Sequence, residues 1–128
     1  MAYTHQVSTR AETPEGVVQD TATTYTGDTT TAVATTVDAN GGSANAVAIA
    51  FLAAGLQHML LLATVPCVVT LTGCTVINGV TASTVTLAAN VMTRVTSVTG
   101  NCTAISVGAN TTGAGAAGTI TIAVLHNS

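Results

Sequence analysis

Residues Gly118–His126 read GTITIAVLH, a segment in which apolar and hydroxyl side chains alternate. The alternation places Ile120, Ile122 and Val124 on one face and the intervening threonines on the other. A period of two residues is typical of a β-strand that buries one face and exposes the other. We therefore expect this segment to be a strand packed on a hydrophobic core.

The same pattern recurs upstream. Ser83–Ala88 (STVTLA) places Val85 and Leu87 on one face, and Thr4–Glu12 is either an extended arm or a first strand. The other expected strands are Gly16–Tyr25, Thr29–Asp38, Ala46–Leu52, His58–Thr64, Cys67–Thr72, a weaker one around Thr75–Ile77, Met92–Thr99 and Thr103–Ala109. Eight to ten short strands with connections too short for parallel crossovers predict an all-β fold, an antiparallel β-sandwich or barrel.

Composition favours the same fold. Thr, Ala and Val supply 66 of the 128 residues, and the chain has no Trp and no Lys. Thr and Val are β-branched, which restricts their side-chain rotamers and suits a pleated sheet better than a helix.

The run from Ala46 to Val65 is long enough and apolar enough to be considered as a membrane span. Gly55, Gln57 and His58 interrupt its middle, and no Lys or Arg flanks it. We therefore expect two buried strands joined by a short turn, and no membrane partner.

Formal charge is scarce and unevenly distributed. Six of the seven charged residues lie within the first 38 residues, and Arg94 is the only one after Asp38. A surface with so little charge does little to keep copies of the chain apart, so we expect it to be covered by identical copies or by a partner. Two arginines and a net charge of −3 leave no basic footprint for nucleic acid. The expected organisation is an N-terminal arm over residues 1–13 and a sandwich domain over residues 14–128.

The chain offers no catalytic, metal-binding or cofactor-binding motif. His5, His58 and His126 are expected to be structural residues in the arm, at a turn and at a strand end, and no spacing pairs them as metal ligands. The three cysteines, Cys67, Cys74 and Cys102, are expected to be small buried side chains, and whether two of them form a disulfide is left open. We predict a structural protein that is not an enzyme and uses no cofactor.

The order of several segments resembles that of a known class of virion protein. These segments are ATTYTGD (22–28), IAFLAAGLQHMLL (49–61), CVVTLT (67–72), VTLAANVMTRVTS (85–97), NCTAISVGA (101–109) and GTITIAVLHN (118–127). Together they resemble the small, jelly-roll-like cement (decoration) proteins of tailed-bacteriophage capsids. The resemblance implies a protein on the outer capsid surface that binds the major capsid protein, often as a homotrimer, and braces the shell.

Within this interpretation the N-terminal third carries the specific contacts, because charge is concentrated there. The expected contact residues are Tyr3, His5, Arg10 and Glu12 in the arm, with Arg94 as the one charge available to the rest of the fold. Alternatives are another virion component, such as a head-fibre or tail protein, and a cell-surface filament or adhesin subunit. The last would need an export signal, and residues 1–30 have no apolar stretch typical of one.

Overall fold

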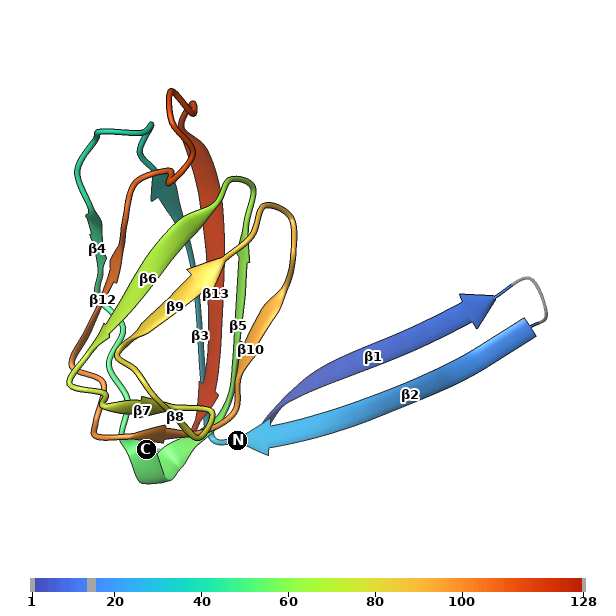
Figure 1. Ribbon diagram of the computed structural model, residues 1–128. Coiled ribbons are helices and arrows are strands. Elements are labelled where there is room, and N and C mark those ends of the chain that lie inside the picture. Colours follow the sequence, from blue (N-terminus) through green and yellow to red (C-terminus); the bar gives the residue numbers. More distant parts are fainter. Residues whose placement is uncertain (1, 14–15, 128) are drawn as a thin grey trace.

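A computed structural model describes the backbone of residues 2–13 and 16–127, and their side chains apart from those of residues 7–13 and 16–23. The chain is an all-β protein made of antiparallel sheets (Figure 1). Its strands are β1 (Tyr3–Thr13), β2 (Gly16–Gly27), β3 (Thr29–Val37), β4 (Asn45–Val47), β5 (Leu56–Ala63), β6 (Cys67–Thr72), β7 (Val76–Ile77), β8 (Val80–Thr81), β9 (Thr84–Leu87), β10 (Thr93–Val95), β11 (Val98–Thr99), β12 (Ala104–Val107) and β13 (Gly118–His126), and a 3-10 helix, η1, spans Ala53–Gly55.

Two four-stranded sheets form the sandwich. One has the strand order β10-β5-β13-β3 and the other β4-β12-β6-β9, while a small sheet, β11-β7-β8, lies at one end (Figure 1). The predicted antiparallel β-sandwich is therefore confirmed, and the jelly-roll arrangement stays a prediction. The described residues form thirteen strands, more than the eight to ten expected, because three of them have only two residues.

The core lies between the two large sheets and follows the predicted alternation. In β13, Ile120, Ile122 and Val124 are fully buried, and in β9 the buried residues are Val85 and Leu87. These side chains join one continuous cluster with residues of β5, β6 and β12, among them Met59, Leu61, Val69, Leu71, Ile105 and Val107. Burying them removes apolar surface from water, which is the main stabilising term of the fold.

The segment Met92–Thr99, expected to be one strand, is divided between two sheets. β10 pairs with β5, whereas β11 pairs with β7. The side chain of Asn78 explains the break, because its amide donates to the carbonyl of Arg94 and its oxygen accepts from the backbone N–H of Thr96. These two bonds occupy backbone groups that a continuous strand would use in its ladder.

The segment Ala46–Leu52 is also less regular than expected. β4 covers Asn45–Val47, and beyond it Phe51 forms an isolated bridge with Cys102. The predicted single helical turn is present as η1, after which the chain enters β5. Among the described residues no helix has the length and apolar character needed to cross a membrane.

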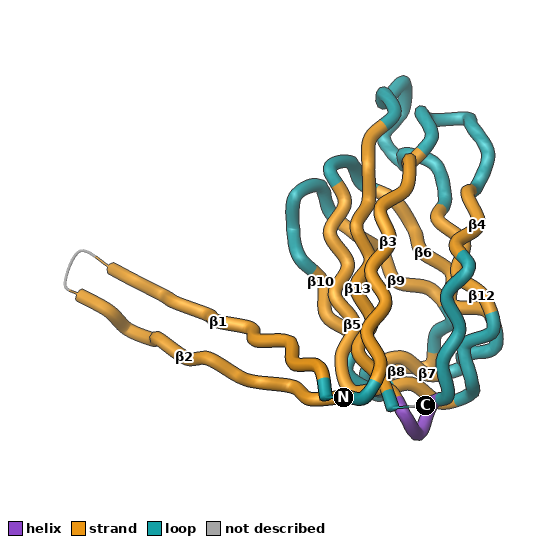
Figure 2. The backbone as a smooth tube through the Cα atoms, turned by 180° about the vertical axis from the view of Figure 1, so that it is seen from behind, coloured by secondary structure: helices purple, strands orange, loops and turns teal. Residues whose placement is uncertain are grey.

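β1 and β2 form a separate hairpin. They pair along their whole described length, from Tyr3 opposite Gly27 to Thr13 opposite Gly16. Figures 1 and 2 show this ribbon extending away from the sandwich, with its base near the chain's N-terminal end. The expected boundary between residues 13 and 14 falls between these two strands. In the structure β2 belongs to the hairpin together with β1, and the first strand of the sandwich is β3.

Candidate interaction site

The β1–β2 hairpin is the most distinctive feature of the surface. With eleven and twelve residues its strands are the longest in the molecule's described part. At about 3.4 Å per residue the ribbon reaches roughly 35–40 Å. A two-stranded ribbon is marginally stable in water when nothing covers it. The hairpin is therefore a part of the surface that would gain stability if another surface covered it.

A cluster of aromatic rings attaches the base of the hairpin to the sandwich. The ring of Tyr25 on β2 stacks on that of His58 on β5, with 4.2 Å between ring centroids and an angle of 11° between the planes. His5 on β1 meets the same His58 ring edge-on at 5.8 Å. The Nε2 atom of His5 also lies 3.3 Å from the hydroxyl oxygen of Thr30 on β3. We call His5, Tyr25 and His58 the joint.

The backbone also approaches the sheet closely at the joint. Gly27, the last residue of β2, is buried, and a Cβ placed there would lie 3.0 Å from Cγ of Leu125 on β13. Just beyond it, the backbone N–H of Asp28 donates to the side-chain oxygen of Asn127. The hairpin therefore leaves the sandwich from a packed and hydrogen-bonded base.

His58 is buried in a way that is rare for a histidine. Its side chain is 0% exposed, and neither ring nitrogen has a hydrogen-bond partner among the described residues. Burial lowers the pKa of His58, and the nearby positive charges of His5 and Arg94 lower it further. Burial also lowers the pKa of His5, whose Nδ1 atom is buried and has no partner among the same residues. The joint therefore favours neutral imidazoles.

The structure places three of the five expected contact residues around the joint. Tyr3 is 40% exposed at the start of β1, His5 belongs to the joint, and Arg94 is exposed on β10, one strand away from His58. The other two, Arg10 and Glu12, lie in β1, but their side chains are outside the described residues. In the hairpin register Arg10 is opposite Asp20.

His58 and Tyr25 were not predicted as site residues. His58 was expected at a turn, but it lies inside β5, where it is in phase with Leu60 and Leu62 and out of phase with the core residues Met59 and Leu61. That phase indicates the outer face of the sheet, where a histidine would normally reach water. The sequence therefore predicts the face on which His58 lies. It does not predict that the hairpin covers this face.

An uncharged surface adjoins the hairpin base. β3 is the edge strand of its sheet, and none of its nine residues is charged. The outward-facing side chains of β3 are exposed threonines and alanines: Thr30, Ala32, Ala34 and Thr36. Asn45 covers one end of this edge by donating to the carbonyl of Thr36. Proteins that remain monomeric usually protect such edges with charged residues, so this strand suits close packing with another chain.

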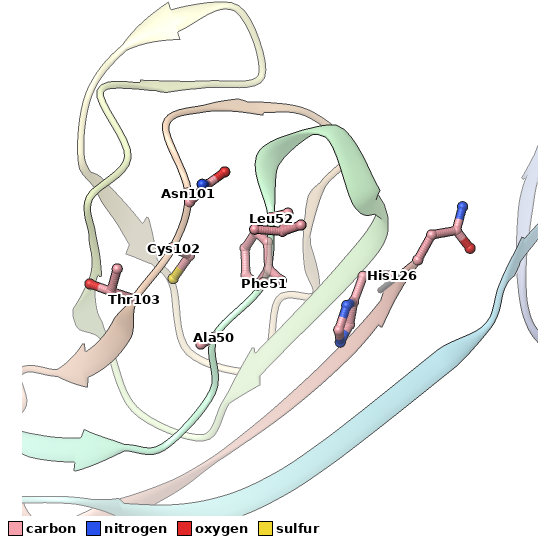
Figure 3. Close-up of a pocket in the computed structure, with 8 residues that line it drawn as sticks. Ala50, Phe51, Leu52, Asn101, Cys102, Thr103 and His126 are labelled. Atoms are coloured by element: carbon pink, nitrogen blue, oxygen red, sulfur yellow. The ribbon is translucent and has the colours of Figure 1, made fainter.

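A hollow of about 520 Å³ lies at the hairpin end of the sandwich, beside η1 (Figure 3). It is mostly apolar, and the residues that line it are Ala50, Phe51, Leu52, Asn101, Cys102, Thr103, His126 and Asn127. Leu52 is 53% exposed there, and the ring of His126 lies 6.3 Å from that of Phe51. The side-chain oxygen of Asn101 accepts a hydrogen bond from the backbone N–H of Ala53, so it is bound within the chain.

The thiols offer little nucleophilic chemistry. Cys67, Cys74 and Cys102 are all free and buried. Burial raises the pKa of each, to about 11 for Cys102, so each thiol stays protonated at neutral pH. Cys67 belongs to the core between the sheets, whereas His58 lies on the outer face of β5, so the structure does not pair them as nucleophile and base.

Among the side chains that the structure describes, which leave out residues 7–13 and 16–23, no three of His, Cys, Asp or Glu gather as a possible metal site. Comparison of the chain with protein-family models, curated proteins and solved structures gives no match.

Proposed function

We propose that this chain is a structural protein that attaches to the outside of a bacteriophage capsid through its β1–β2 hairpin and stabilises the shell, as a cement protein does. The observation that carries the proposal is the hairpin, which extends from the sandwich as a long two-stranded ribbon (Figure 2). In the described part of the chain neither β1 nor β2 pairs with a third strand, so their outer edges could add to a sheet of another protein, which is a common way for strands to recognise a partner.

The distribution of charge supports a division of labour between hairpin and sandwich. Five of the seven formal charges belong to residues 1–28, and the sandwich carries only Asp38 and Arg94. Asp38 is used within its own loop, where its carboxylate accepts from the backbone of Ser43 and the amide of Asn45. Specific polar contacts are therefore assigned to the hairpin, and packing between copies to the nearly uncharged sandwich, most simply in a symmetric homo-oligomer such as a trimer.

The choice of a capsid as the partner rests on the resemblance of the segment order to that of phage cement proteins. On that basis the partner is the major capsid protein and the location is the outer surface of the virion. The absence of a motif for catalysis in the sequence agrees with a purely structural role.

Co-sedimentation tests this function directly. The full chain is mixed with expanded empty capsids of the phage that encodes it, and we expect it to pellet with them at a fixed ratio to the capsid protein. The double variant Arg10→Ala/Glu12→Ala should bind at least tenfold more weakly, which corresponds to about 1.4 kcal/mol. Thr111→Glu is the matched control and should bind like the wild type, since Thr111 is exposed in the loop between β12 and β13. That loop lies at the end of the sandwich away from the hairpin base (Figure 1).

Two results would overturn the proposal. Sedimentation no greater than that of the protein alone removes the capsid role. Light scattering that shows a monomer at high protein concentration removes the packing role assigned to the sandwich.

A further inference from the structure

The joint between hairpin and sandwich holds two histidines where a positive charge is poorly tolerated. His58 is 0% exposed between the ring of Tyr25 and the sheet, and His5 touches it edge-on. Three of their four ring nitrogens are buried and have no hydrogen-bond partner among the described residues. A protonated imidazole needs partners for both N–H groups, and burying one without them is strongly unfavourable.

We propose that the joint is a pH-sensitive latch: with neutral histidines it holds the hairpin base against the sandwich, and in mild acid it releases the base. The device concerns the attachment of the hairpin to its own sandwich. It can therefore be tested in the chain alone, without a capsid or any other partner.

Among the described side chains, the two charged or titratable groups that act on the titration of His58 both lower its pKa. His5 approaches from β1 and Arg94 from β10, and both disfavour a positive charge on His58. Tyr25 approaches from β2 and stacks its ring on that of His58. From β13, Leu125 packs against the hairpin at Gly27, and His126 lies in the opposite phase of that strand, near Phe51.

From β3, the group that faces the joint is the hydroxyl of Thr30, which lies beside the ring of His5. The adjacent carboxylate belongs to Asp28, between β2 and β3, and accepts a hydrogen bond from the hydroxyl of Thr29. Burial lowers the pKa of both His58 and His5, so its cost to a protonated ring outweighs any attraction from this carboxylate.

The sign of the pH effect follows from these groups. In a released hairpin the two histidines are exposed and titrate near the ordinary value of 6.5, whereas in the docked joint the pKa of each is lower. The docked joint therefore has its full stability above pH 6.5 and loses it as the pH falls below that value. For each histidine, every pH unit that separates the two titration midpoints changes the docking equilibrium up to tenfold.

Nuclear magnetic resonance on the full chain tests the latch. Histidine ring signals and the contact between the rings of Tyr25 and His58 are followed from about pH 8 to about pH 4.5. We expect a His58 midpoint below 6.5 and loss of the ring contact over the same pH range, while the amide signals of β5 and β13 keep their folded positions. A ring contact that persists after His58 is protonated, or unfolding of both strands at the same midpoint, overturns the proposal.

Three variants separate the latch from general acid sensitivity. His58→Phe keeps an aromatic ring against Tyr25 but cannot be protonated, so of the two joint histidines only His5 still titrates and the ring contact should persist to a lower pH than in the wild type. His126→Gln is the matched control on the other face of β13 and should release like the wild type. If His58→Phe does not fold, His5→Phe takes its place. It keeps a ring beside His58 and removes one of the two titrating groups, so the contact between the rings of Tyr25 and His58 should persist to a lower pH than in the wild type, and release at an unchanged pH refutes a latch built from both histidines.

Discussion

The backbones of Gly100 and Gly73 approach each other so closely that we expect the substitution Gly100→Ala to be severely destabilising. Gly100 has a φ of +87°, a left-handed conformation that costs an L residue about 1–2 kcal/mol. In addition, a Cβ at this position would clash with the carbonyl oxygen of Gly73. Relieving that clash requires backbone strain of about 1–3 kcal/mol. Together the two terms predict a loss of about 2–5 kcal/mol in the free energy of unfolding.

The contact matters because it holds the connection after β11 against the connection after β6. Next to it, the N–H of Thr103 donates to the carbonyl of Thr72 at 2.9 Å, and the Cys74 thiol lies 3.4 Å from the carbonyl of Gly100. Any movement that accommodates the new methyl group also disturbs these bonds. The strain is therefore difficult to relieve locally.

Gly79→Ala is the matched control, because Gly79 has a similar φ of +81° but, apart from its own chain neighbours, no residue lies within 4 Å of the point that a Cβ would occupy there. It should lose only the conformational part, about 1–2 kcal/mol. Urea unfolding followed by circular dichroism, at one protein concentration for all variants, measures both. If Gly100→Ala is no more destabilising than Gly79→Ala, the close backbone contact is refuted.

Two further perturbations test the core and the thiols. Leu61→Ala, at a fully buried position of β5, should lower the unfolding free energy by about 2–5 kcal/mol, whereas Leu62→Ala on the next, 39% exposed residue should change it by less than about 1 kcal/mol; similar losses in urea unfolding would contradict the assigned strand phase. A disulfide reagent that absorbs on reaction should label Cys67, Cys74 and Cys102 in the folded chain only as fast as the chain opens, because burial keeps all three protonated and covered; rapid labelling at neutral pH would contradict their burial.

Strands with a strict local alternation could be predicted almost to the residue. Cys67–Thr72 and Gly118–His126 have the predicted bounds, and Thr84–Leu87 lies one residue inside its predicted range at each end. These segments were predictable because the two-residue period of side-chain direction is a property of the strand itself. Which face is apolar then determines which face meets the core.

The division of Met92–Thr99 could not be predicted in the same way. The break depends on Asn78, which lies in the turn between β7 and β8 and reaches the backbone of Arg94 and Thr96 across the fold. In the sequence these residues are separated by more than a dozen positions. A pattern read within one segment carries no information on such a contact.

The candidate site was predicted in part. The concentration of charge near the N-terminus pointed to this region, and His5 lies at the joint while Arg94 lies beside it. His58 and Tyr25 were missed, because a histidine in phase with outward-facing leucines is expected to reach water. The stack between their rings depends on where a separate hairpin lies, which no local pattern specifies.

By itself, the sequence determined the β character of the chain, the inner and outer faces of its best strands and the near absence of charge on the sandwich. Those properties are local, since they follow from side-chain type and from the alternation of each strand. Only the tertiary structure decided that β2 pairs with β1 outside the sandwich and that their base encloses His58. The physical reason is that a Thr/Val strand presents the same backbone hydrogen-bonding groups to any partner, so its pairing is settled by long-range packing.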